Sequence, residues 1–493
     1  MKRGGNTFIG SAATDSVTML TAGTFAASSV ESVTGTTGTS DILRMLGAGS
    51  SSVSAVETVL GSTATDSITL MASGSLAASA VETVIGAADT DTLTMLGGGT
   101  TKISSIESVV GGTGTDSVVM LESGNLSVSS VETVTGNTTT DVVTMLGAGT
   151  MRVSNVETVL GSGSTDTAAL LGGGEVALSG VETVLGGTGT DSVTMFSAGT
   201  LAASSVESVV GTDSTSTNDV LRMLGGAASV SAIESVLGGT ATDTVTMMAG
   251  GSLGISSVET LVGSSDTDVI SMLGAGTTAV SRVETVIGSA GSETAVLLGG
   301  GELNVSALET VIGGTGTDSV TMLNAGTLAA SAIESVIGSA STSTADVLRL
   351  VGATTASISS IESVLGSTGT DTITMLASGS LATSAVDTVV GGSDADVLTL
   401  LGAGTVTVSQ VESIVGSAAS DTAILIGGGD LAVSRVDTVV GGASTDTITM
   451  LGAGNLAVSR VESVIGSAST TTNDVVSLIG GGDVALSAVE TVA

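Results

Sequence analysis

The chain of 493 residues contains no His, Cys, Pro, Trp or Tyr, and only three Phe. Without His and Cys it lacks the usual general bases, the thiol nucleophiles and the common zinc ligands of enzymes. Paired carboxylates can also perform catalysis, but that chemistry needs one cleft with its own constellation of residues. Every candidate carboxylate here belongs to a pattern that recurs along the chain. We therefore expect no enzyme activity.

Basic residues are also scarce. There are 10 Lys and Arg against 47 Asp and Glu, which gives a formal net charge of -37. Binding to nucleic-acid phosphates or to anionic lipids needs clustered basic residues, so neither is expected as a main function. Divalent cations are the natural partners of such a chain.

Long apolar segments are absent. The first residues, "MKRGGNTFIG", lack the apolar stretch of 7 to 15 residues that defines a signal peptide. No uninterrupted apolar segment is long enough to span a bilayer, so we expect no membrane insertion. The lack of Cys is compatible with a secreted protein without disulfides, but it does not fix the compartment.

The chain is built from one repeat. The pattern [VIL]-[ED]-[ST]-[VLI] occurs 19 times, from Glu31 to Glu490, mostly at steps of 25 residues. Extra residues lengthen the repeat in "TDSTSTNDVLRM" at 212–223 and in the equivalent segments 339–350 and 467–478. These segments lie about 127 residues apart, which predicts a higher repeat of five units.

Each unit contains three short apolar runs separated by Gly, Ser and Thr, which is typical of strands rather than helices. We predict an all-β parallel β-solenoid of about 19 coils, each of 25 residues with three short strands. Residues 1–493 would form one continuous array that is a fragment of a longer one or uncapped at both ends. In the first run, Val193 and Met195 are expected to face the core, with Ser192 and Thr194 outside. In the third run, a corner or a bulge would turn both Val181 and Val184 inward.

Most of the negative charge belongs to two recurring positions. One is the acidic residue of the pattern above, and the other is an Asp, once a Glu, that usually precedes it by 16 residues; together they account for 38 of the 47 acidic residues. If each position stacks from coil to coil, neighbouring carboxylates lie about 4.8 Å apart and repel one another. Salt, hydrogen-bond donors or bound cations would have to offset this repulsion.

The turn before this Asp carries a recognisable motif. "GGTGTDSV" at 111–118, 186–193 and 313–320 resembles the nine-residue glycine and aspartate repeat of RTX-type secreted proteins. In that family such turns bind calcium between the coils of a parallel β-roll. The resemblance implies that Asp116, Asp191 and Asp318 bind calcium together with backbone carbonyls. Here, however, the motif occurs once per 25 residues rather than in tandem.

Three turns carry a second carboxylate, which makes them further candidates for calcium. These pairs are Asp89 with Asp91, Asp266 with Asp268, and Asp394 with Asp396. The alternative at every such turn is that the Asp serves only the turn, since its side chain accepts hydrogen bonds from nearby backbone N–H groups.

Taken together, these features predict a non-enzymatic extracellular or cell-surface protein, exported without a classical signal peptide. It would form an elongated acidic rod with a structural or adhesive role, similar to the repeats of bacterial adhesins and surface-layer proteins. Its partners would be divalent cations, and itself or components of the cell surface or matrix. A calcium-gated RTX-type module is the main alternative. Ice binding through outward Thr pairs such as Thr92 and Thr94, and polysaccharide binding, are further alternatives.

Overall fold

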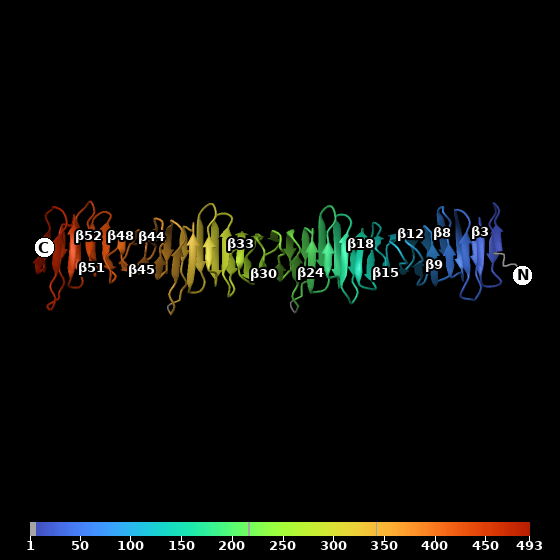
Figure 1. The fold of residues 1–493 in the computed structure, drawn as a ribbon, viewed down its shortest axis with the longest axis horizontal. Helices are drawn as coiled ribbons and strands as arrows, with labels where there is room; N and C mark the ends of the chain where they lie inside the picture. Colours follow the sequence, from blue (N-terminus) through green and yellow to red (C-terminus); the bar gives the residue numbers. More distant parts are fainter. Residues whose placement is uncertain (1–5, 215–216, 342) are drawn as a thin grey trace. The chain divides into compact units, whose positions relative to one another are not determined.

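The computed structural model describes residues 6–214, 217–341 and 343–493. These residues form β-strands and turns, and no helix in the described ranges is long and apolar enough to cross a membrane. The chain divides into two compact units, Met1–Thr246 and Met247–Ala493. In each unit short parallel strands stack in sequence order, as the colours of Figure 1 show. The predicted fold class, an all-β parallel β-solenoid, is confirmed.

The strands are short, and their lengths recur with the sequence repeat. In the first unit, six consecutive strands illustrate the pattern: β11 (Thr92–Met95), β12 (Gly99–Ser104), β13 (Ser108–Val110), β14 (Asp116–Met120), β15 (Asn125–Ser129) and β16 (Thr133–Thr135). In the second unit, the equivalent strands are β47 (Val397–Leu400), β48 (Gly404–Ser409), β49 (Ser413–Val415), β50 (Asp421–Leu425), β51 (Gly429–Ser434) and β52 (Thr438–Val440).

Each coil contains two strands, one in each of two sheets, rather than the three that the sequence predicted. β14 pairs in parallel with β12 and β16, while β13 pairs with β11 and β15. The three strands of one repeat therefore make one and a half coils. The two units together have about 28 turns, so the predicted count of about 19 coils was wrong. The error arose because the length of the sequence repeat was taken as the length of a coil.

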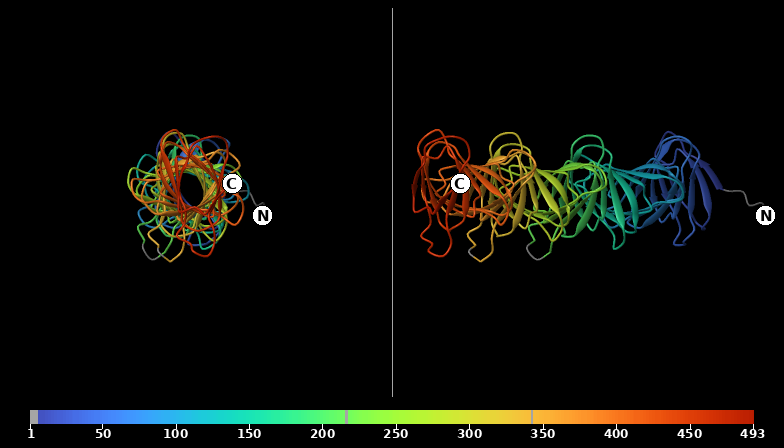
Figure 2. Two further views of the ribbon diagram at one scale, coloured as in Figure 1. Left: turned by 90° about the vertical axis from the view of Figure 1, so that its left-hand side faces the viewer. Right: turned by 60° about the vertical axis from the view of Figure 1, so that its left-hand side comes forward.

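Two sheets suit the composition of the chain. Facing sheets lie about 10 Å apart, and Val, Leu, Ile and Met side chains can fill that space without aromatic residues. The inward positions are the predicted ones, since Val193 is fully buried and Met195 is 6% exposed. Ser192 and Thr194 lie on the outer face. Figure 2 shows how the successive coils of each unit stack on one another.

Three connections recur in every repeat, and we name them from the repeat that begins at Asp116. The Leu turn (residues 121–124) joins the first strand to the second, and the corner (residues 130–132) joins the second to the third. The Asp turn (residues 136–140) leads to the Asp of the next repeat. Because a repeat makes one and a half coils, the same connection lies on opposite edges of the solenoid in consecutive repeats.

Along one edge, successive coils present a Leu turn, an Asp turn and a corner, in that order. Gly98 of one Leu turn lies against Thr115 of the Asp turn in the next coil. Gly111 of that Asp turn lies in turn against Ser130 of the following corner. Each edge therefore repeats every three coils.

The corner depends on a left-handed residue. In 18 repeats this residue is not Gly, and its φ lies between 50° and 56°. In one repeat it is Gly180, with φ 65°. The chain reverses there, so that both Val181 and Val184 point inward, as the sequence predicted. Whether residues 1–493 form one continuous array with a five-unit higher repeat stays a prediction.

Candidate functional site

The recurring Asp closes its own turn. In the repeat of Asp116, the carboxylate oxygen Oδ2 accepts a hydrogen bond from the N–H of Gly112 at 2.8 Å. The Asp is fully buried, and so are its equivalents from Asp41 to Asp446. This is the hydrogen bonding for which Asp is favoured in turns.

The lengthened turns keep the same closure. Ser339 and Ser467 donate their N–H groups to Asp346 and Asp474, seven residues on, rather than to an Asp four residues on. The extra residues therefore lie inside a loop that is closed in the usual way. Residues 215–216 and 342 of these turns lie outside the described part of the chain.

The recurring Glu binds one coil to the next. The Asp116 N–H donates to Oε2 of Glu132 at 2.7 Å, and the Glu132 N–H donates to the Asp116 carbonyl at 3.1 Å. Asp437 can replace the Glu, because its carboxylate accepts the Asp421 N–H at 2.9 Å. The sequence showed that these acids recur but did not show this pairing, which needs the arrangement of coils.

The expected ladders of stacked carboxylates do not form. Asp116 begins a strand of one sheet, and Asp141 precedes β17 (Val142–Met145) in the other sheet. Equivalent Asp residues on the same edge are three strand spacings apart, about 14 Å at 4.8 Å each. That separation exceeds the screening length of about 8 Å at physiological salt. The repulsion predicted from stacking every 4.8 Å was therefore wrong, and the close carboxylate of each Asp is its Glu partner.

The glycines of the GGTGTD turns follow from packing between turns. A Cβ on Gly112 would lie 2.2 Å from the carbonyl oxygen of Met95 in the preceding coil. Gly114 has φ 123°, and its Cβ would lie 3.0 Å from Gly98. The same contacts occur at 187, 189, 314 and 316. Each GGTGTD turn lies on a Leu turn that contains three consecutive glycines, at 97–99, 172–174 and 299–301. This coupling is visible in the sequence once the coil length is known.

The GGTGTD turns leave one carboxylate oxygen unpaired. Oδ1 of Asp116 is buried and accepts no hydrogen bond within the described residues, and the same holds for Asp191 and Asp318. In the repeat of Asp91, by contrast, Oδ1 accepts the N–H of Gly74 at 2.7 Å. The difference arises because the equivalent N–H, that of Gly99, is directed to the carbonyl of Thr115.

Burial and hydrogen bonding act in opposite directions on the pKa of a recurring Asp. Burial raises the pKa of Asp116, with a further contribution from Glu132, and the single bond from Gly112 does not offset it. Burial and Glu207 raise the pKa of Asp191 in the same way. Burial also acts on Asp41, but bonds from Thr36 and Gly23 outweigh it and lower the pKa of that carboxyl.

The predicted Asp pairs divide between two environments. Asp91, Asp268 and Asp396 are fully buried and close their turns. Their partners Asp89, Asp266 and Asp394 are exposed at the tips of the same turns. One carboxylate of each pair therefore lies in solvent, while the other is engaged by the backbone.

The donor set fits calcium only in part. Calcium takes six to eight oxygen ligands. Each GGTGTD turn supplies one buried, unpaired carboxylate oxygen, and no group of three Asp or Glu residues converges among the residues that the structure describes. The remaining ligands would have to be backbone carbonyls and water.

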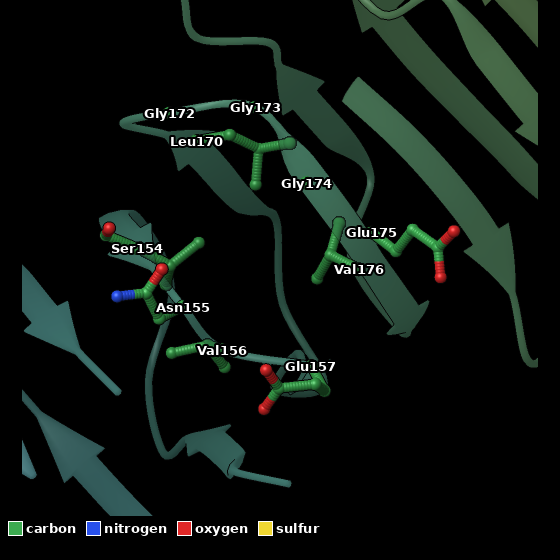
Figure 3. Close-up of a pocket in the computed structure, with 11 residues that line it drawn as sticks. Ser154, Asn155, Val156, Glu157, Leu170, Gly172, Gly173, Gly174, Glu175 and Val176 are labelled. Atoms are coloured by element: carbon green, nitrogen blue, oxygen red, sulfur yellow. The ribbon is translucent and has the colours of Figure 1, made fainter. Parts of the chain in front are cut away.

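Shallow pockets recur at equivalent places. Figure 3 shows one of about 130 Å³, formed by the corner segment 153–157 and the Leu-turn segment 170–176, with Glu157 at its wall. Equivalent segments line pockets at 103–107 with 120–125, and at 458–462 with 478–484. The outward Thr residues form only short rows in the described part of the chain. Thr94 lies between Ala77 and Val110 of the adjacent strands. The register places Thr355, Thr372, Thr388 and Thr407 side by side on four successive strands.

Comparison with known proteins gives no relative. No family model matches the chain, and no curated protein or solved structure matches it.

Proposed function

We propose that the chain is a non-enzymatic structural or adhesive repeat protein of the extracellular space or cell surface. One observation supports this proposal. The recurring Asp and Glu carboxylates accept backbone hydrogen bonds that hold turns and coils together in repeat after repeat. The pockets described above also recur from repeat to repeat. Catalysis needs one distinct constellation, and a recurring pocket does not provide it.

A metal titration tests this structural role. A passive structural protein should give the same strand signal by circular dichroism, and the same melting temperature, in EDTA and in millimolar calcium. A chain that is disordered in EDTA and folds on adding calcium would contradict the passive role. The location needs a separate test: protease added to intact producing cells should digest the chain, and protection until the cells are lysed would contradict surface exposure.

A calcium-gated module, similar to those of RTX-type secreted proteins, is the second candidate. The unpaired Oδ1 atoms of Asp116, Asp191 and Asp318 favour it, because a buried carboxylate oxygen without a donor is a natural cation ligand. Calorimetric titration should then show calcium binding that weakens when these three residues are replaced by Asn. Part of the binding should remain, because Oδ1 of Asp66 and of Asp421 is also buried and unpaired within the described residues.

The matched control replaces Asp91, Asp141 and Asp371 by Asn. Their Oδ1 atoms already accept N–H groups from the neighbouring coil. Equal loss of binding in both triple variants would remove the assignment to the GGTGTD turns.

A further inference from the structure

Every Leu turn begins with a large apolar residue that points into solvent. From the repeat of Asp41 onward, these side chains are between 43% and 61% exposed. The N–H of Leu121 donates to the carbonyl of Ile103 at 2.8 Å, so the backbone is held while the side chain projects. The residues are Leu46, Met71, Leu96, Leu121, Leu146, Leu171, Phe196, Leu224, Met248, Leu273, Leu298, Leu323, Val351, Leu376, Leu401, Ile426, Leu451 and Ile479. We call them the edge residues.

The edge residues form two rows in each unit. Because Leu turns alternate between edges, one row of the first unit contains Leu46, Leu96, Leu146 and Phe196. The other row contains Met71, Leu121, Leu171 and Leu224. Neighbours within a row are three strand spacings apart, about 14 Å. Single exposed apolar side chains are normal on a protein surface, and only contiguous patches mark interaction sites on their own. What distinguishes the edge residues is that they recur at a fixed spacing along a row.

A recess lies beside these residues. In the first unit the pocket of Figure 3 is lined by Leu170 and Gly172, the two neighbours of Leu171, by Val153 of the strand Gly149–Ser154 and by Val156 of the corner. Four other corners have a similar pocket, and three of these pockets are also lined by residues of an Asp turn. In the second unit these pockets lie on both edges. Where these pockets occur, apolar projections and recesses recur with the same period along an edge.

The regular spacing of the projections and recesses favours a second copy of the chain as the partner. A partner with any other spacing could meet one projection and one recess, whereas a second copy of this chain repeats both at the same interval. A single half-exposed side chain is far too small for a stable interface, which buries about 800 Å² on each partner. A row of projections that enters a row of recesses can supply such an area only if the two spacings agree.

We propose that the edges dock on a second copy of the chain, with edge residues of one copy seated in corner recesses of the other. This inference rests on the proposed structural role, and it names the partner.

Because the edges are acidic, the strength of the proposed self-association should depend on the salt concentration. The recess of Figure 3 is lined by Glu157 and Glu175, and the chain as a whole is strongly acidic. Two copies therefore repel one another at low salt. Raising the ionic strength from about 0.01 M to 0.15 M shortens the screening length from about 30 Å to 8 Å. Self-association should become stronger over that range, by at least about tenfold in dissociation constant.

Analytical ultracentrifugation of the full chain tests this. We expect dimers or larger species at high micromolar concentration in 0.15 M salt, and mostly monomer in 0.01 M salt. A monomer under both conditions would overturn the proposal. So would association that weakens as salt is added, which would indicate an attraction between opposite charges.

Cysteine cross-linking tests the contact itself, and the absence of native Cys makes it specific. Chains carrying Leu121→Cys or Leu146→Cys, which represent the two edges, are each mixed with chains carrying Asn155→Cys at a corner recess. Oxidation should link at least one of these mixtures into mixed dimers. The matched control is Leu185→Cys, a similarly exposed apolar residue at 37% that lies on a strand rather than in a Leu turn. Equal cross-linking by Leu185→Cys would overturn the edge contact.

These outcomes separate the inference from the function on which it rests. A chain that folds in EDTA but stays monomeric would keep the structural role and remove the edge contact. If the chain needs calcium to fold, both experiments are done in calcium. Association by ultracentrifugation and cross-linking through the edge residues then test the edge contact as before.

Discussion

At the residue scale, the chain tolerates backbone conformations that ordinary residues disfavour. The left-handed corner residue is Ala, Ser, Arg, Asn or Gln in 18 repeats, although this conformation costs L-residues about 1–2 kcal/mol. The cost persists because the corner must turn two apolar side chains into the core. The sequence predicted a corner near this position but could not fix the residue, since no Gly or Asn pattern marks it.

Replacing Ala80 by Gly should stabilise its corner. Ala80 has φ 53°, and Gly removes that strain at an entropic cost of about 0.5–1 kcal/mol, which leaves a net gain of about 0.5 kcal/mol. Gly180→Ala should reduce stability by a similar amount. The added Cβ would make only ordinary contacts, but the φ of 65° is strained for Ala. Hydrogen exchange of the amides beside each corner measures the change. A gain from both substitutions would contradict the assignment of strain.

Two Asp residues should respond to pH with opposite sign. Asp41 has a lowered pKa, so its ionised form contributes stability above the ordinary value of 3.8, and this is lost as pH falls through the folded pKa. Asp116 has a raised pKa, so the stability that it contributes is complete below 3.8 and is lost as pH rises through the folded pKa. The cost of Asp41→Asn should therefore grow with pH, and that of Asp116→Asn should shrink.

Local hydrogen exchange between pH 3 and pH 7 can follow both variants. At neutral pH we expect Asp41→Asn to cost about 1–3 kcal/mol, because three donors converge on that carboxylate. Asp116→Asn should cost less, because only the Gly112 N–H bonds to its carboxylate. Parallel pH profiles for the two variants would show that the unpaired oxygen of Asp116 has no effect.

At the element scale, turns of neighbouring coils constrain one another. The Asp turn with GGTGTD lies on the middle glycine of a Leu turn, and a side chain at Gly98 or at Gly112 would displace the turn that it faces. The motif that resembled a calcium repeat therefore has a sufficient cause in packing. Sequence reasoning identified the motif and its three best copies, but it could not see the contact, which joins segments one coil apart.

Gly112→Ala should be strongly destabilising, since its Cβ would lie 2.2 Å from the backbone oxygen of Met95. We expect a loss of several kcal/mol, or displacement of the turn, because backbone cannot move aside as a flexible side chain can. Gly47→Ala is the control, because a Cβ there meets nothing within 4 Å. Thermal melts of the two variants provide the comparison, and similar melting temperatures would contradict the packing argument.

At the scale of the whole molecule, the sequence predicted the parallel solenoid, the inward and outward positions and the recurring acids. It did not predict the number of coils. Strand lengths and turn signals specify the length of the repeat, but they do not specify how many residues make one coil. The length of a coil follows from the pairing of β12 with β14, and no pattern within one short segment of sequence shows that pairing. The pairing of Glu132 with Asp116 and the grouping of the edge residues into rows depend on where the coil closes, and sequence reasoning missed both for that reason.

The repeat rather than the coil should be the unit that can be removed. Deleting residues 116–140 takes out one repeat and leaves every turn beside its usual neighbours, so the chain should fold with little change in melting temperature. Deleting residues 116–132 takes out one coil, removes the Asp that closes a turn and places that turn before the wrong strand. A sharply lower strand signal is expected for the second deletion, and equal folding of both would contradict the coil assignment.

The three-strand repeat on a two-strand coil has a consequence for symmetry. Each repeat is related to the next by a half turn about the axis of its unit, so the two edges of a unit are equivalent surfaces. A docking surface on one edge is then duplicated on the other, and contacts between copies need not close into pairs. Under the proposed docking, such a molecule would add a neighbour on each side and grow into open layers, a mode of assembly that point-group oligomers cannot follow.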